Sequence, residues 1–174
     1  MENTSAKILV AVFDRTVCVQ VNGRADFTST VDLKKLITEL WERGYSHFIF
    51  DLCDCRMMDS TFMGVLAGIS LQLSNGKADA PPLELLNACP RVTETLENLG
   101  VAHLFKIGDS TGPISDKFEP LAQGDPASRV EVARTCLEAH RTLMELNPGN
   151  AQKFKDVAQF LAEDVKRLEI GNQK

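Results

Sequence analysis

The segment from residue 48 to residue 73 constrains the fold more than any other part of the chain. An apolar run, FIFD at 48–51, ends in an aspartate, and its continuous hydrophobic character predicts a central strand that other elements cover. A short acidic stretch follows, and a second apolar run opens on the tripeptide DST at 59–61, which predicts a helix over 60–74. A strand, a loop and a helix in this order are typical of α/β folds, which place their functional sites near the carboxyl ends of strands.

The rest of the first 109 residues continues this alternation. Alternating apolar residues predict two antiparallel strands over 8–14 and 17–21, and a helical period predicts a helix over 27–43 that ends at Gly44. The remaining elements are bounded by turn-forming residues: Asn75-Gly76 after the helix at 60–74, Pro81-Pro82 before a strand over 83–86, Pro90 at the start of a helix to about Asn98, and a last strand over 104–107. The order β-β-α-β-α-β-α-β predicts a mixed, mostly parallel sheet with crossover helices.

The last third of the chain has a different composition. Residues 110–125 are rich in Gly, Pro, Ser and Asp, which predicts a linker between a domain over 1–109 and a helical region over 126–170. Asp125-Pro126 is the predicted N-cap pair, and the breaker NPGN separates two helices with apolar stripes, which predicts an α-helical hairpin. The stripes must be buried somewhere, so the hairpin is either a structural layer on the first domain or an element for partner binding or homodimerisation.

Composition and charge narrow the classes of function. The 174 residues carry a net charge of −5 and are 44% hydrophobic, as expected for a globular protein that binds neither nucleic acid nor anionic lipid through a basic patch. The chain shows no secretory signal and no apolar run long enough for membrane insertion, so we expect a cytoplasmic protein. The five cysteines are irregularly spaced and are expected to be free thiols. Cys53-Asp54-Cys55 is either a metal clip or, more simply, a strand end with one core cysteine.

Ser60 is the residue whose position suggests regulation. A hydroxyl at a helix start lies where backbone N–H groups converge and the helix dipole favours negative charge, so a phosphate on Ser60 would occupy a site suited to an anion. Thr61 fits a first-turn residue better than a phosphoacceptor. The simpler interpretation is that Ser60 only caps the helix, because serine is among the preferred N-cap residues. The residues by themselves leave both interpretations open.

Other chemistries find less support. Asp51, Asp54 and Asp59 follow the central strand, as in the acidic Mg²⁺ pocket of a phospho-accepting receiver domain, but FDR at 13–15 lacks the paired acids that this pattern needs after the first strand. No Ser or Cys partner is suggested by the spacing of the histidines at 47, 103 and 140, and the common nucleotide-binding motifs are absent. We therefore predict a protein that is not an enzyme and that uses no cofactor or metal.

Three motifs within residues 6–109 resemble those of the STAS domain, the fold of bacterial anti-sigma factor antagonists. The turn GRAD at 23–26 resembles the family's G-x-L-D turn before the first helix, and FIFDL at 48–52 resembles its central strand. MDSTFMGVL at 58–66 resembles the D-S-[ST]-G-L-G-[VI]-L helix opening, whose first serine is the phosphoacceptor. The resemblance implies an α/β fold with a STAS-like mixed β-sheet and crossover helices, followed in this chain by the C-terminal α-helical hairpin.

The resemblance also implies a partner switch, a regulatory protein-binding module of bacterial signalling and transcription regulation. The unmodified protein would bind an anti-sigma factor that is also a serine kinase. Phosphorylation of Ser60 would end that binding, and a phosphatase would restore it. The expected partner contacts surround the helix start: Asp26, Asp51, Asp59, Ser60, Thr61, Phe62 and Met63.

Phe62 departs from the family pattern, which usually has glycine at this position. Its side chain either packs inward or presents an apolar contact to a partner, and the sequence leaves this open. An alternative function implied by the resemblance is a cytoplasmic STAS subunit of a lipid-transporting ABC complex. In that case Phe62 and the exposed helix start would anchor the protein on a transporter ATPase.

Overall fold

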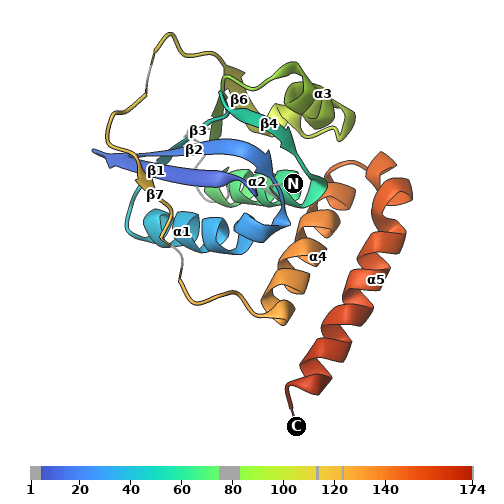
Figure 1. Ribbon diagram of the computed structural model, residues 1–174. Helices are drawn as coiled ribbons and strands as arrows, with labels where there is room; N and C mark the ends of the chain where they lie inside the picture. Colours follow the sequence, from blue (N-terminus) through green and yellow to red (C-terminus); the bar gives the residue numbers. More distant parts are fainter. Residues whose placement is uncertain (1–4, 75–82, 113, 123, 174) are drawn as a thin grey trace.

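The computed structural model describes residues 5–74, 83–112, 114–122 and 124–173, and these residues form a seven-stranded mixed sheet with helices packed against it (Figure 1). The strands are β1 (Lys7–Phe13), β2 (Thr16–Ala25), β3 (His47–Asp51), β4 (Cys55–Met58), β5 (Leu83–Leu86), β6 (Phe105–Gly108) and β7 (Glu119–Pro120). The α-helices are α1 (Thr30–Glu42), α2 (Ser60–Ser74), α3 (Pro90–Asn98), α4 (Arg129–Leu146) and α5 (Gly149–Gly171), with 3-10 turns at Phe27–Ser29 and Ala102–Leu104. The predicted mixed sheet with crossover helices and a C-terminal hairpin is confirmed.

The central strands of the sheet are parallel, and the edge that contains β1 is antiparallel. The order is β6-β5-β3-β2-β1-β7, and β4 pairs with the far end of β2. β3 pairs in parallel with β2 and β5, and β5 with β6, whereas β1 runs antiparallel to β2 and β7. Because β4 runs parallel to β2, its carboxyl end delivers the chain directly to the start of α2 at Ser60.

Strands β4 and β7 were not predicted from the sequence. β4 is the four-residue run CRMM, which is buried at its two ends only, so it is too short to show a period of two residues. β7 falls inside the stretch interpreted as a linker, 110–125, and pairs two residues with Leu9 and Val10 of β1. The turn signals Asn75-Gly76 and Pro81-Pro82 fall outside the described residues.

The start of α4 corrects a second prediction. Asp125 is not the N-cap, because the helix begins at Arg129 behind a capping box formed by Ser128 and Glu131. The Glu131 amide donates to Ser128 Oγ at 3.2 Å, and the Ser128 amide donates to Glu131 Oε2 at 2.9 Å. This reciprocal pair satisfies two backbone donors at the helix start, whereas a lone aspartate cap satisfies fewer.

Both faces of the sheet are covered. On the helical face, buried aromatic residues such as Phe48, Phe50 and Phe62 form one cluster with side chains of α1, α2 and α3. On the other face, Ala11, Cys18 and Ile49 are buried, with Ile114 and Phe118 packed against their cluster. This double coverage explains why the β3 sequence is apolar without alternation.

The C-terminal hairpin lies beside the α2 side of the domain. α4 packs along α2, and α5 packs antiparallel against α4 and extends away from the sheet (Figure 1). Ala133 and Leu137 of α4 form a separate apolar cluster with Ala158 and Val165 of α5. The hairpin packs on the first domain, as in the first of the two roles predicted for it. Among the helices that the structure describes, none combines the length and the apolar character needed to cross a membrane.

Candidate functional site

Asp59, not Ser60, caps helix α2. Its carboxylate oxygen Oδ1 accepts from the Phe62 amide at 2.7 Å, and its backbone carbonyl accepts from the Met63 amide at 3.0 Å. Its second oxygen, Oδ2, accepts from the Phe27 amide at 3.1 Å and so ties the helix start to the 3-10 turn before α1. Ser60 is therefore the first residue inside the helix, and its hydroxyl is not needed as an N-cap.

The hydroxyl of Ser60 instead contacts a histidine of the C-terminal hairpin. Ser60 Oγ lies 3.0 Å from Nε2 of His140 in α4. His140 Nδ1 lies 2.7 Å from the carbonyl oxygen of Cys136, which can only accept a hydrogen bond. In the neutral imidazole, Nδ1 therefore carries the hydrogen and Nε2 accepts the Ser60 proton. His140 is buried, at 5% exposure, and its ring makes an edge-to-face contact with Phe154 of α5.

Sequence reasoning missed His140 as a site residue. The spacing of the histidines suggested no serine partner, whereas the structure places Ser60, 80 positions away in the chain, within hydrogen-bond distance of His140. The third member of the pairing is a backbone carbonyl and not a carboxylate, so the arrangement is not a Ser-His-Asp triad. No sequence pattern near residue 140 could have identified His140, because its role comes from a contact between α4 and α2.

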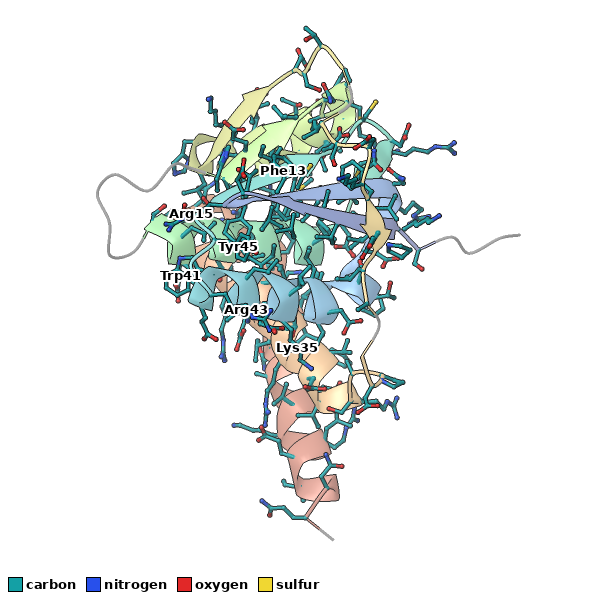
Figure 2. All side chains as sticks on the ribbon, turned by 90° about the vertical axis from the view of Figure 1, so that its left-hand side faces the viewer. Phe13, Arg15, Lys35, Trp41, Arg43 and Tyr45 are labelled. Atoms are coloured by element: carbon teal, nitrogen blue, oxygen red, sulfur yellow. The ribbon has the colours of Figure 1, made fainter. Side chains whose placement is uncertain are left out.

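The two helices approach each other closely beside this pair. A methyl group added at Gly64 of α2 would lie 2.5 Å from the carbonyl oxygen of Ala139, so only glycine fits at this contact. Two ion pairs join α4 to α1: Lys34 to Glu138 at 2.6 Å and Lys35 to Glu131 at 3.1 Å. Figure 2 shows Lys35 projecting from α1 toward the hairpin. The start of α2 is thus covered by a helix that the family motif does not include.

Apart from Asp51, the residues predicted to contact a partner divide by burial into two groups. Asp26, Asp59 and Ser60 are partly exposed and lie together, since the charge of Asp26 acts on the titration of Asp59. Thr61 is 6% exposed, and Phe62 and Met63 are fully buried. The Phe62 side chain therefore packs inward, which decides between the two orientations that the sequence left open.

Asp51 belongs to a different set of contacts from Ser60. Its carboxylate accepts from the Cys53 amide at 3.1 Å and from Asn87 Nδ2 at 3.0 Å, and it is 7% exposed. Asn87 in turn donates to Ser110 Oγ at 2.9 Å. This network joins the ends of β3 and β5 to the segment after β6, so its contacts are structural ones within the chain.

Burial shapes the electrostatics around Ser60. It raises the pKa of Asp59 above the ordinary value of 3.8, and the nearby charge of Asp26 acts in the same direction. Burial also raises the pKa of the Cys136 thiol. A further negative charge at this position would meet an acidic, partly desolvated environment.

The described residues hold no group of three or more His, Cys, Asp or Glu side chains arranged to bind a metal ion. Cys53 is exposed and Cys55 is buried, so the two thiols of the Cys-Asp-Cys sequence lie in different environments. A groove of about 500 Å³ lies between Phe27 and the hairpin, with Cys136, Leu161 and Leu168 in its wall.

A second exposed surface lies at the opposite end of α1 from this groove. Figure 2 shows Phe13, Arg15, Trp41, Arg43 and Tyr45 around the β1–β2 turn and the end of α1. Phe13 and Trp41 are 38% and 39% exposed. Arg43, which directly follows α1, is paired with Glu39 of that helix.

Comparison with known proteins agrees with the fold of the first domain. The STAS domain model matches residues 7–113, which is more than half of the chain and ends before α4. No curated protein matches the chain. Among solved structures, the chain is similar to a Thermotoga maritima protein described as an anti-sigma factor antagonist, with 20% identity, a TM-score of 0.52, and coverage of 59% of this chain and 86% of that one. It is also similar to the unphosphorylated anti-sigma factor antagonist SpoIIAA, with 23% identity, a TM-score of 0.52, and coverage of 60% and 88%. These likenesses show the fold.

Proposed function

Because this chain belongs to the STAS domain family, we propose that it is a regulatory binding module that switches partners in the manner of an anti-sigma factor antagonist, with Ser60 as the phosphorylated residue. A role as a binding module and not as an enzyme is part of this proposal, and membership of the STAS family supports it. The proposed partners are an anti-sigma factor with serine kinase activity and a phosphatase, and the proposed compartment is the cytoplasm.

The observation that carries this proposal is the state of the Ser60 hydroxyl. Asp59 performs the capping role, so the competing explanation for a serine at this position loses its force. Ser60 is partly exposed, and its side-chain hydroxyl donates a hydrogen bond to His140. Modification of Ser60 would therefore leave the helix cap at Asp59 intact.

Phosphorylation of Ser60 would change both the charge and the hydrogen bonding of the site. The phosphate ester has no hydroxyl hydrogen, so the donor that now faces His140 Nε2 is lost. The phosphate adds about −1.5 to −2 charge. That charge would lie beside Asp59, which burial and Asp26 already place in an unfavourable environment for a negative charge. Such a change reshapes the surface at the start of α2 while α2 keeps its own N-cap.

The proposal is tested by capturing partners from the native cell with three full-length baits: wild type, Ser60→Asp and Ser74→Asp. Ser74 is the last residue of the same helix and is exposed, so its variant controls for an added carboxylate on α2. We expect a soluble kinase-like partner to bind wild type and Ser74→Asp and to lose about tenfold or more of its affinity for Ser60→Asp. Equal binding by all three baits would contradict the proposal.

The same experiment distinguishes the alternative function. The alternative function, a STAS subunit of a lipid-transporting ABC complex, requires Phe62 as an interface anchor. The Phe62 side chain is fully buried, so no specific observation favours that alternative. Capture of a membrane transporter ATPase equally by all baits would support it in place of the phosphorylation switch.

A further inference from the structure

The α4–α5 hairpin is a helical pair that is docked on the sheet domain by one of its helices. Ala133, Leu137, Ala158 and Val165 form an apolar cluster between α4 and α5. Ala139 and Leu143 of α4 are buried in the cluster under the sheet, together with side chains of α1, α2 and α3. α4 therefore contacts the domain through buried apolar anchors, as a helix bound in a groove does.

The contact between α4 and the domain has the composition of a docked interface. Near its middle it is made of small or polar groups: Gly64 against Ala139, and Ser60 against His140. A cavity of about 190 Å³ runs along this contact, lined by Lys34, Gly68, Thr135 and Thr142 among others. This cavity is partly open to solvent, whereas Gly64 and Ala139 beside it are in close contact, so α4 meets the domain tightly at one point and leaves room along the edge of the contact.

Charge complementarity accompanies this incomplete packing. Lys34 and Lys35 of α1 pair with Glu138 and Glu131 of α4, and all four side chains are more than 40% exposed. The two glutamates are seven residues apart, which is about two helical turns and roughly 10 Å along one face of the helix. Exposed pairs of this kind add little to stability but select which helix fits and in which direction.

We propose that the α1–α2 face is a helix-binding surface, that α4 is its intramolecular ligand, and that the external partner is an amphipathic helix of the same pattern. Such a helix has a small residue opposite Gly64 and two acidic residues two turns apart opposite Lys34 and Lys35. The inference rests on the proposed function in one respect, since the site is the same and the partner helix would compete with α4 for the surface around Ser60. A tethered ligand at an effective concentration on the order of millimolar keeps this surface closed to weak competitors.

The test uses full-length chains and a labelled peptide with the sequence of residues 128–147, which contains α4 with its capping box. Binding is measured by fluorescence anisotropy for wild type, Glu138→Lys and Glu145→Lys. Glu145 is exposed on the same helix and forms none of the ion pairs found with α1, so its variant matches the change in charge. A second opening variant, Ala139→Glu, places a bulky charged side chain against Gly64.

We expect the Glu138→Lys chain to bind the peptide about tenfold more tightly than wild type and Glu145→Lys, because the resident α4 now repels Lys34. A peptide that carries the same Glu138→Lys change should bind the opened chain several-fold more weakly. Hydrogen exchange within 130–143 should rise in both opening variants, while the sheet retains its protection.

The proposal is overturned if neither opening variant binds the peptide, or if neither raises exchange in α4, because α4 is then a fixed structural layer. If the opened chain instead forms a dimer that excludes the peptide, the α1–α2 face binds a second copy of this chain. That result would overturn the proposal of an external partner helix. The assay contains neither phosphate nor a cellular partner, so its failure and the failure of the Ser60 capture experiment are separate results.

Discussion

Ser60 Oγ and His140 Nε2 lie 3.0 Å apart, although 80 positions separate the two residues in the chain. The first belongs to the helix opening that carries the STAS motif, and the second to a hairpin beyond the residues that the family model matches. The contact therefore links the proposed modification site to the one part of the chain that distinguishes it from the compared domains.

Ser60→Ala removes the donor to a buried imidazole nitrogen. Because His140 is left with an unsatisfied acceptor, we expect the free energy of unfolding to fall by about 1–2 kcal/mol and hydrogen exchange in α4 to rise. Ser70→Ala is the matched control, since Ser70 also lies in α2 but donates to the Leu104 carbonyl at 2.6 Å. It should lower stability without loosening α4, and equal exchange in the two variants would contradict the contact.

Gly64→Ala and Gly68→Ala should have opposite effects on stability. At Gly64 the added methyl meets the Ala139 carbonyl oxygen at 2.5 Å, so we expect a loss of about 1–3 kcal/mol by overpacking. At Gly68 nothing lies within 4 Å, so alanine should stabilise the helix by about 0.5–1 kcal/mol. Urea denaturation measures both, and a neutral Gly64→Ala would show that α4 is not held close to α2.

Asn150→Ala should loosen the corner of the hairpin. The fully buried Asn150 side chain donates to the carbonyls of Leu99 at 2.9 Å and Leu143 at 2.8 Å, which fastens the α4–α5 turn to the end of α3. We expect a loss of about 2 kcal/mol, on the scale of two buried hydrogen bonds. Thermal unfolding should place Asn172→Ala, at the exposed end of α5, within about 0.5 kcal/mol of wild type.

The raised pKa of Asp59 predicts the sign of a pH effect. The native state holds the Asp59 proton more tightly than the unfolded chain does, so this group contributes stability below pH 3.8, and the contribution is lost as pH rises through the native pKa. Wild type should therefore lose stability relative to Asp59→Asn as pH rises through that window. A series of urea denaturations checks this, with the exposed Asp54→Asn as control for charge. A relative gain by wild type would mean that its cap hydrogen bonds outweigh burial.

Much of the fold was predictable from the sequence because apolar periodicity, capping residues and turn residues determine its helices and strands locally. Ser60–Ser74 is a helix as expected, since an acidic residue precedes an apolar run, and Gly44 ends α1 with a positive φ of 97°. The start of α4 was misplaced because two local caps competed, and the Ser128–Glu131 box satisfies more backbone donors than Asp125 does. β4 was missed because four residues are too few to show a period.

The sequence by itself determined the α/β class, the hairpin and the position of a serine at the start of a buried helix, because periodicity, capping residues and turn residues act over a few neighbouring positions. The tertiary structure alone decided that Asp59 takes the capping role between two segments, that Phe62 faces inward, and that His140 covers Ser60. These outcomes depend on how two surfaces fit, such as Gly64 against Ala139, and a fit between residues far apart in the chain leaves no periodic trace.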